Sequence, residues 1–320
     1  MTSSQSTQFG IHLPVRVTSD GQTPGVPARA KLLDEMAVAA GESGFRSLWI
    51  TDHLLYLDPW MDAVLFLASV AGRAEQYGLK LIPGVLALPL RHPVAMAQTL
   101  ATLDILSGGN LVIGVGEGST QKDFDAVGLP FEERRRRLNE AVPLLRRLFT
   151  EEHVTHHGAH YSFEDISVLP HPAQQPHPPI WMSSWGSEVG MRRVARLGDG
   201  WVASGWHSTP EEYGEARKVL DRELAARGKE PGAFPGCADT IYVYVDESDN
   251  RAVEAASPII KHTTGGFENT SGHYIVGDYA RCRELLGLWK AQGPAHVALW
   301  PAANPVEQIR LFGEHVLPYV

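Results

Sequence analysis

The sequence predicts an α/β protein built as a (β/α)8 barrel, and two observations support that prediction. Apolar segments of strand length alternate along the chain with segments whose apolar residues recur at helical spacing. The strand-length segments number eight, the count of a β/α barrel, and an open doubly wound sheet is the alternative. The expected strands are Phe9–Leu13, Ser47–Ile50, Lys80–Leu88, Leu111–Val115, Ile180–Ser183, Gly200–Ala203, Thr240–Val245 and His296–Trp300.

Three of the intervening segments have the pattern of helices. In Phe131–Thr150 the apolar residues share one face, and Pro143 is expected to bend the helix. The range Ala95–Leu106 is followed by Ser107-Gly108-Gly109, which is a helix stop signal. Glu188–Leu197 is the third expected helix.

Composition narrows the class of protein. Of the 320 residues, 43% are hydrophobic and 20% are charged, which is typical of a globular protein with a sizeable core. The formal net charge of −9 argues against a surface for nucleic acid or an anionic membrane. We expect a disordered tail at residues 1–8 and a single domain at 9–320. Without a signal-peptide pattern or a membrane-length apolar run, a cytoplasmic protein is expected.

Two longer segments are expected to be loops rather than barrel elements. His153–Pro179 is rich in His, Pro and Gln, and its part Gly158–Phe163 has the pattern of a short hairpin. Ser257–Tyr274 contains three glycines and is expected to be mobile. The basic run Arg134–Arg137 is expected to form a solvated helix face with ion pairs to Glu132, Glu133 and Glu140.

No metal site is expected. Cys237 and Cys282 are too few and too far apart for a zinc site or a disulfide framework, so they are interpreted as reduced core thiols. A histidine cluster lies in a polar segment without a supporting carboxylate arrangement, and metal binding there is disfavoured. Its members are His153, His156, His157 and His160.

The strongest candidate for chemistry is the pair Asp52-His53. It follows the apolar run at Leu48–Ile50 after one residue, Thr51, so it stands at the end of an expected buried strand. Burying such groups without partners costs several kcal/mol, which makes them poor core residues. Imidazole titrates near neutral pH and a neighbouring carboxylate can tune it, so this pair indicates acid–base chemistry, with a capped turn as the structural alternative.

Two further strand ends have small or polar residues. Gly114-Val-Gly-Glu-Gly118 lacks the third glycine of a dinucleotide fingerprint, and we interpret Gly116 and Gly118 as allowing a flat ring close to the backbone. Glu117 is a candidate catalytic carboxylate or a solvent-facing loop residue. Ser183-Ser-Trp-Gly-Ser187 precedes the third helix, so it predicts an anion site or simple N-capping by serine.

These segments, in this order, resemble the bacterial-luciferase-like superfamily of flavin- and deazaflavin-dependent oxidoreductases. The resemblance runs from Phe9 to about Phe312. Its most specific pieces are Leu48-Trp-Ile-Thr-Asp-His53, Leu88-Pro-Leu-Arg-His-Pro93, Ala97–Gly109, Ile113-Gly-Val-Gly-Glu-Gly118, Gly128-Leu-Pro-Phe-Glu-Glu-Arg134, Pro178-Pro-Ile-Trp181 and Arg193–Trp201.

The resemblance implies a (β/α)8 barrel that binds FMN or its deazaflavin analogue, coenzyme F420, at the carboxyl ends of the strands. It implies that His53 acts in proton transfer next to Asp52. It also implies a bulge at Gly84-Val85, with a non-proline cis peptide, behind the cofactor ring. The strand ends and the resemblance together give the candidate cofactor-binding residues Asp52, Gly84, Val85, Gly116, Gly118, Ser184, Trp185, Gly186, Ser187 and Ser204.

The chain departs from the family pattern at two places. Ser183-Ser184-Trp185-Gly186 stands where many relatives have a Gly-Gly pair, so anion binding here would depend more on hydroxyl groups. Asn110 replaces the arginine usual after Ser-Gly-Gly, which removes an ion pair but no catalytic group.

The leading hypothesis is a coenzyme F420-dependent oxidoreductase that transfers hydride to or from a small organic substrate. The second is a monooxygenase that uses O2 and reduced FMN from a separate reductase, inside a dry pocket. The third is a flavin-binding protein without turnover. A flavin or F420 reductase and a second copy of the chain, as a homodimer, are the protein partners considered.

Overall fold

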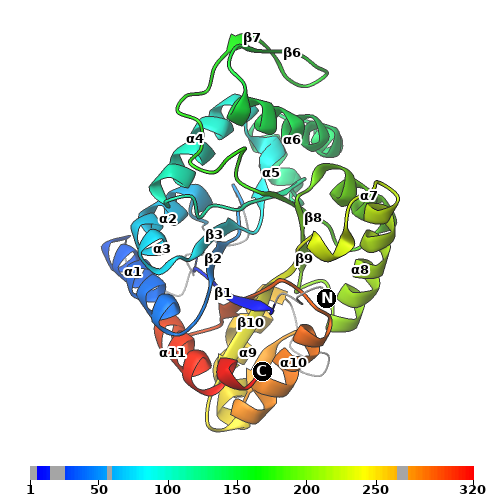
Figure 1. The fold of residues 1–320 in the computed structure, drawn as a ribbon. Coiled ribbons are helices and arrows are strands. Elements are labelled where there is room, and N and C mark those ends of the chain that lie inside the picture. Colours follow the sequence, from blue (N-terminus) through cyan, green and yellow to red (C-terminus); the bar gives the residue numbers. More distant parts are fainter. Residues whose placement is uncertain (1–5, 15–25, 56–59, 265–272) are drawn as a thin grey trace.

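The computed structural model describes residues 6–14, 26–55, 60–264 and 273–320. Its parallel strands form a nearly closed barrel surrounded by helices (Figure 1). The strand order around the barrel is β3-β2-β1-β12-β10-β9-β8-β5-β4, and β11 pairs with β10 outside this ring. The predicted (β/α)8 architecture is therefore confirmed. The bounds are β1 Gln8–His12, β2 Ser47–Ile50, β3 Lys80–Pro83, β4 Leu86–Ala87, β5 Ile113–Gly116, β8 Ile180–Ser183, β9 Gly200–Ser204, β10 Gly236–Val245, β11 Ile275–Gly277 and β12 His296–Pro301.

The third expected strand, Lys80–Leu88, is wrong as a continuous strand. It divides into β3 and β4 at Gly84-Val85, and the two parts pair with different neighbours, β2 and β5. A parallel bridge between Leu81 and Leu111 connects β3 to the segment before β5. This one predicted strand therefore supplies both the first and the last strand of the order around the barrel. For that reason eight expected strands appear as nine in the ring.

Helices cover the outside of the barrel on all sides (Figure 1). The expected helix Glu188–Leu197 matches α7, and Ala95–Leu106 lies within α4. The helix expected from Phe131 begins as a 3-10 turn and continues as α6, with Pro143 inside it. The bounds are α1 Val26–Glu42, α2 Ala63–Ser69, α3 Ala71–Tyr77, α4 Pro93–Leu106, α5 Gln121–Ala126, α6 Arg134–Thr150, α7 Glu188–Leu197, α8 Pro210–Ala225, α9 Asp249–Thr264, α10 Tyr279–Ala291 and α11 Pro305–His315.

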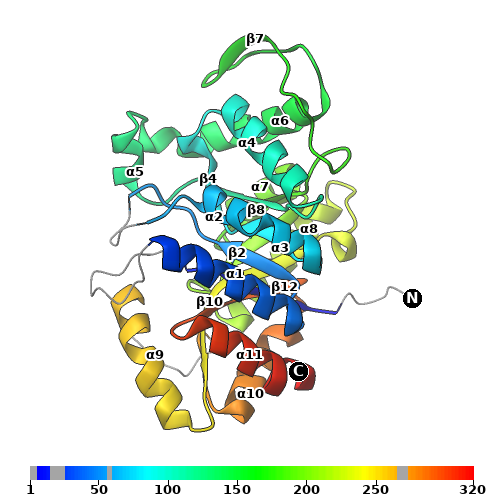
Figure 2. The same ribbon diagram turned by 90° about the vertical axis from the view of Figure 1, so that its left-hand side faces the viewer.

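The two segments expected as loops differ from each other in the structure. The first contains an antiparallel hairpin, β6 Val154–His157 and β7 Ser162–Ile166, which projects beyond the helices (Figures 1 and 2). For the second segment, the prediction of a loop was wrong over residues 257–264, because these residues continue α9. Ala252, Ala256 and Ile260 are fully buried at a spacing of four, so packing holds the helix despite Pro258. Residues 265–272 of this expected loop lie outside the described residues.

The barrel interior holds its own core, separate from the core between strands and helices. It contains Trp49, Ile82, Val112, Trp181, Val202, Cys237 and Ala298. His296 packs its ring against Trp49 and Trp181, and burial lowers its pKa to about 4. Both cysteines are buried and free, as expected. The interior is therefore filled by side chains, and chemistry must take place at an end of the barrel.

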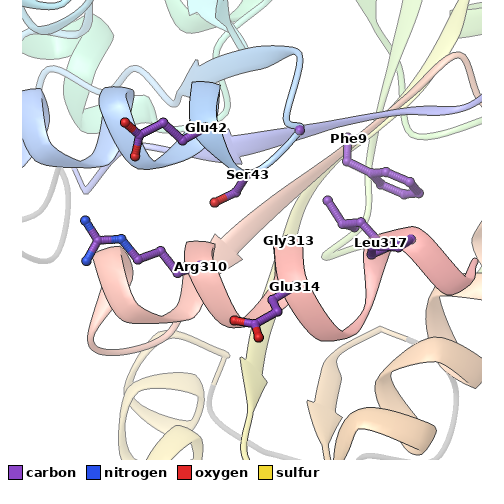
Figure 3. Close-up of a pocket in the computed structure, with 9 residues that line it drawn as sticks. Phe9, Glu42, Ser43, Arg310, Gly313, Glu314 and Leu317 are labelled. Atoms are coloured by element: carbon purple, nitrogen blue, oxygen red, sulfur yellow. The ribbon is translucent and has the colours of Figure 1, made fainter.

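The expected tail at residues 1–8 lies mainly outside the described residues, and Gln8 already belongs to β1. Among the described residues, no helix has both the length and the apolar character to cross a bilayer. An open hollow lies where β1 begins, between the end of α1 and α11 (Figure 3). It is at the amino-terminal face, where barrels place structural rather than catalytic residues. Its lining residues are Phe9, Glu42, Ser43, Gly44, Arg310, Gly313, Glu314, Leu317 and Pro318.

Candidate active site

The sequence-predicted site residues follow different strands but share one face of the barrel. His53 follows β2, Val85 follows β3, Glu117 follows β5 and Ser184 follows β8, while Ser204 ends β9. These strands are parallel, so their carboxyl ends open on the same side. In Figure 2, α5 and α9 lie on the side opposite the start of β1. We call this carboxyl-terminal opening the mouth.

His53 is half-buried at the mouth and faces a carboxylate. Its Nδ1 lies 3.6 Å from Oδ2 of Asp123, and its ring stands edge-on to Trp60 at 5.1 Å. Burial lowers the pKa of His53, and the negative charges of Asp123 and Asp52 oppose that shift. The net lowering favours the neutral imidazole near neutral pH, which is the form that accepts a proton.

Asp123 is a functional candidate that the sequence analysis missed. It lies in α5 and is 2% exposed, and its Oδ1 accepts a hydrogen bond from the Leu55 N–H at 2.7 Å. That bond joins α5 to the segment after His53, so the carboxylate and the imidazole are held by the same contact. In the sequence, Asp123 looks like an ordinary polar helix residue, and only its burial distinguishes it.

Asp52 is directed away from His53. Its two oxygens accept hydrogen bonds from Arg91 at 2.6 and 2.8 Å, and Oδ2 also accepts from the Ala87 N–H at 3.0 Å. This bidentate pair joins the end of β2 to the turn after β4. Asp52 therefore influences His53 through its charge, whereas Asp123 is the carboxylate in contact with it.

Glu117 is held between two guanidinium groups. Its carboxylate lies 3.0 Å from Arg135 of α6 and 2.8 Å from Arg193 of α7. The expected partners of the basic run are thus partly wrong. Arg137 pairs with Glu133 as expected, but Arg135 pairs with Glu117 across 18 residues.

Glu140, another expected partner of the basic run, holds the hairpin instead. It accepts hydrogen bonds from the backbone N–H groups of His160 and Tyr161. It also contacts His156 at 3.0 Å. Among the described residues, no cluster of histidines, cysteines and carboxylates has the arrangement of a metal site.

The Gly84-Val85 peptide bond is cis, as the resemblance implies. The side chain of Val85 rests on β5: a methyl group added to Gly114 would lie 3.3 Å from it, and one added to Gly116 would lie 2.7 Å from it. These glycines therefore make room for the bulge. Gly118 has a φ of +78° and lies against Phe124, so a turn conformation and close packing both require glycine there.

The serine-rich turn after β8 uses its hydroxyl oxygens locally. The oxygen of Ser187 caps α7 by accepting from the Gly190 N–H at 3.2 Å, and that of Ser184 accepts from the Gly186 N–H at 3.3 Å. Both hydroxyl protons are available as donors to an anion. Glu188 occupies the first turn of α7, and its charge opposes an anion at the helix N-terminus.

An aromatic group borders this turn. Trp185 is 65% exposed and its ring stacks on His207 at 4.4 Å. His207 in turn contacts the ring of Trp206 and accepts or donates a hydrogen bond with Ser204 at 3.0 Å. Burial is the main cause that lowers the pKa of His207, and the nearby His273 lowers it further. This side of the mouth offers flat apolar surface next to hydroxyl groups.

A parallel barrel with acid–imidazole contacts and hydroxyl groups at the carboxyl ends of its strands has the layout of a barrel enzyme. Residues 7–309 match the family described as luciferase-like monooxygenase, and the chain belongs to that family. The family resemblance identified from the sequence is therefore confirmed.

Two curated relatives and one solved structure are similar to the chain. An F420-dependent glucose-6-phosphate dehydrogenase from Kineococcus radiotolerans is 34% identical over 71% of this chain and 67% of its own length. A 5,10-methylenetetrahydromethanopterin reductase from Archaeoglobus fulgidus is 29% identical, over 71% of this chain and 64% of its own. The crystal structure of the monooxygenase RslO1 from Streptomyces bottropensis superimposes with a TM-score of 0.87 at 24% identity, over 98% of this chain and 99% of that one. The matches to two further F420-dependent glucose-6-phosphate dehydrogenases span about half of those proteins (53%).

Proposed function

We propose that this protein is a coenzyme F420-dependent oxidoreductase that oxidises a small alcohol at the mouth of the barrel. The observation that carries the proposal is the half-buried His53 beside Asp123, at the end of β2 and next to the Gly84-Val85 bulge. A neutral imidazole at this position suits proton removal from a hydroxyl group. The F420-dependent relatives support deazaflavin as the cofactor.

The residues present fit such a cofactor. Val85 is half-buried and presents a small apolar surface between β3 and β5 against which a flat ring can lie. The hydroxyl groups of Ser184, Ser187 and Ser204, with Trp185 and Gly186 beside them, would hold the charged tail. The cofactor, when bound, supplies the hydride acceptor.

In the proposed reaction, His53 accepts the proton of the substrate hydroxyl at Nε2, because Nδ1 faces Asp123. The bound cofactor would supply the acceptor for the hydride from the carbon that carries the hydroxyl, and the alcohol would become a carbonyl compound. Asp123 orients the imidazole and stabilises its positive charge after the transfer. Asp52 holds Arg91, and Glu117 holds Arg135 and Arg193. We assign both carboxylates to positioning the loops of the mouth.

A reduced-FMN monooxygenase is the second candidate, and the aromatic side of the mouth favours it. Trp185, Trp206 and His207 offer apolar surface that would help exclude water around a reactive flavin. That reaction would need a separate reductase as partner. A flavin-binding protein without turnover is disfavoured, because a buried carboxylate facing a partly exposed imidazole suits proton transfer better than structure alone.

The test is an anaerobic assay of F420 reduction with a panel of small alcohols and sugar phosphates as donors. We expect reduction by at least one donor and its loss in His53→Ala. Oxygen consumption with reduced FMN, in the absence of any F420 reduction, would reverse the ranking of the two candidates.

A further inference from the structure

A second imidazole–carboxylate pair lies at the mouth, formed between β1, the neighbour of β2, and β10. His12 ends β1 and Asp239 lies in β10, at the level of Ser204, which ends β9. His12 Nε2 and Asp239 Oδ1 are 2.7 Å apart, and the side chains are 0% and 3% exposed. The His12 ring stacks on Trp300 at 4.5 Å, nearly parallel, so the imidazole is held on its face as well as at its edge.

The backbone of β10 is distorted where it presents Asp239. The register with β12 shifts between Ala238 and Ile241, which marks a bulge. Thr240 in this bulge has a φ of +65°, an unfavourable conformation for a β-branched residue. Its N–H donates to Asp239 Oδ1 at 2.7 Å. Bulges and strained residues of this kind occur where a strand must aim a side chain, and the strain is retained at functional sites.

The pair also leaves a buried polar atom without a partner. His12 Nδ1 has no hydrogen-bond partner among the described residues, although the ring is fully buried. A buried nitrogen without a hydrogen bond destabilises the fold, so packing alone gives no reason for an imidazole here. Since the atom is enclosed, we do not assign it a direct contact with a ligand.

Asp239 reaches across the barrel to the bulge behind the proposed cofactor ring. A methyl group added to Gly84 would lie 2.5 Å from Asp239 Oδ2 and 2.8 Å from the Trp49 ring. The carboxylate thus occupies the space that a side chain at Gly84 would take. His12 and the Thr240 N–H fix the carboxylate, and the carboxylate supports the Gly84-Val85 bulge from the barrel interior.

We propose that His12 and Asp239 are positioning residues for the cofactor ring. They hold the Gly84-Val85 bulge in the position in which a planar conjugated heterocycle can pack against Val85. This inference rests on the proposed function, because it requires a ring to bind at the bulge. The pair acts through Gly84-Val85 and transfers no proton to substrate.

The experiment compares Asp239→Asn, His12→Gln and His12→Leu with the wild type. His12→Gln can still donate to Asp239, whereas His12→Leu cannot. Asp104→Asn is the matched control, because Asp104 is also a fully buried carboxylate but bonds Gln174 at the end of α4. The readouts are the Kd of oxidised F420 and of FMN, the visible absorbance spectrum of the bound cofactor, and the thermal midpoint.

We expect Asp239→Asn and His12→Leu to weaken cofactor binding by about 10- to 100-fold and to shift the spectrum of the bound cofactor. His12→Gln should retain most of the affinity, and Asp104→Asn should lower only the thermal midpoint. Wild-type affinity and spectrum in both Asp239→Asn and His12→Leu would overturn the inference and leave the proposed function standing. A wild-type protein that binds neither cofactor would overturn both. If His12→Leu does not fold, the contrast between Asp239→Asn and Asp104→Asn decides.

Discussion

The two imidazole–carboxylate pairs of the mouth differ in distance and in exposure. His53 and Asp123 are 3.6 Å apart and the imidazole is 21% exposed, whereas His12 and Asp239 are 2.7 Å apart and enclosed. A loosely held, accessible imidazole can exchange a proton with a bound molecule. A tightly held, enclosed one can only fix its surroundings. We therefore expect the same two residue types to serve two purposes, with burial deciding which.

The largest effect should come from the accessible pair. His53→Ala removes the proposed proton acceptor, so the single-turnover rate of cofactor reduction should fall by about 10²–10⁴-fold. The Kd of the cofactor should stay close to the wild-type value, because the bulge and the serine turn are unchanged. An unaffected rate would make His53 a structural residue and remove the contrast between the pairs.

Asp52 is an enclosed carboxylate, like Asp239. We therefore expect the loss of its ion pair to lower the stability of the fold. Arg91→Met leaves Asp52 buried without its ion pair and should lower the free energy of unfolding by about 3 kcal/mol. The control is Arg73→Met, which breaks the solvent-screened pair with Asp34 and should cost far less stability than Arg91→Met. Urea titration measures both. Equal losses would show that Asp52 is not an enclosed anchor.

Gly84→Ala tests the contact between the enclosed pair and the bulge. The added methyl group meets Asp239 and Trp49, so we expect a loss of about 1–3 kcal/mol in the free energy of unfolding and weaker cofactor binding. Gly72→Ala is the matched control, because nothing lies within 4 Å of the added group in α3. That change should be neutral or slightly stabilising. A tolerated Gly84→Ala would contradict the packing described for Asp239.

The smallest effect concerns the pH dependence of the accessible pair. The neutral imidazole is the active form, so kcat/KM should fall as the pH drops below the pKa of His53. Asp123 raises that pKa, against the lowering by burial, so Asp123→Asn should move the acid limb to lower pH. The rate at neutral pH should also fall by about tenfold through lost orientation. A limb that moved to higher pH would contradict the assigned contact.

The sequence predicted what depends on neighbours along the chain. The eight strands follow from apolar runs, and Asp52-His53 was identified because two polar residues stand together after a strand. Asp123 and Asp239 could not be found in this way, since each meets its histidine only when distant elements come together, over 70 and 227 residues. For the same reason, the sequence did not predict that Asp52 binds Arg91. It also did not predict that Lys80–Leu88 divides into two strands with different neighbours.

Thr240 shows a second limit of sequence reasoning. The segment Thr240–Val245 reads as a regular strand, and the true strand begins at Gly236 and contains a bulge. A β-branched residue with positive φ runs against local preference, so no local pattern predicts it. The backbone conformation of Thr240 depends instead on the placement of the neighbouring Asp239 side chain by the surrounding structure.

Titration of the apoprotein with F420 and with FMN tests most directly the claim that the mouth is a deazaflavin-dependent site. Both affinities are measured under identical anaerobic conditions, with Asp104→Asn as the control for general loss of stability. The account predicts clearly tighter binding of F420. A preference for FMN of about tenfold, or 1.4 kcal/mol, would contradict it and place the monooxygenase first.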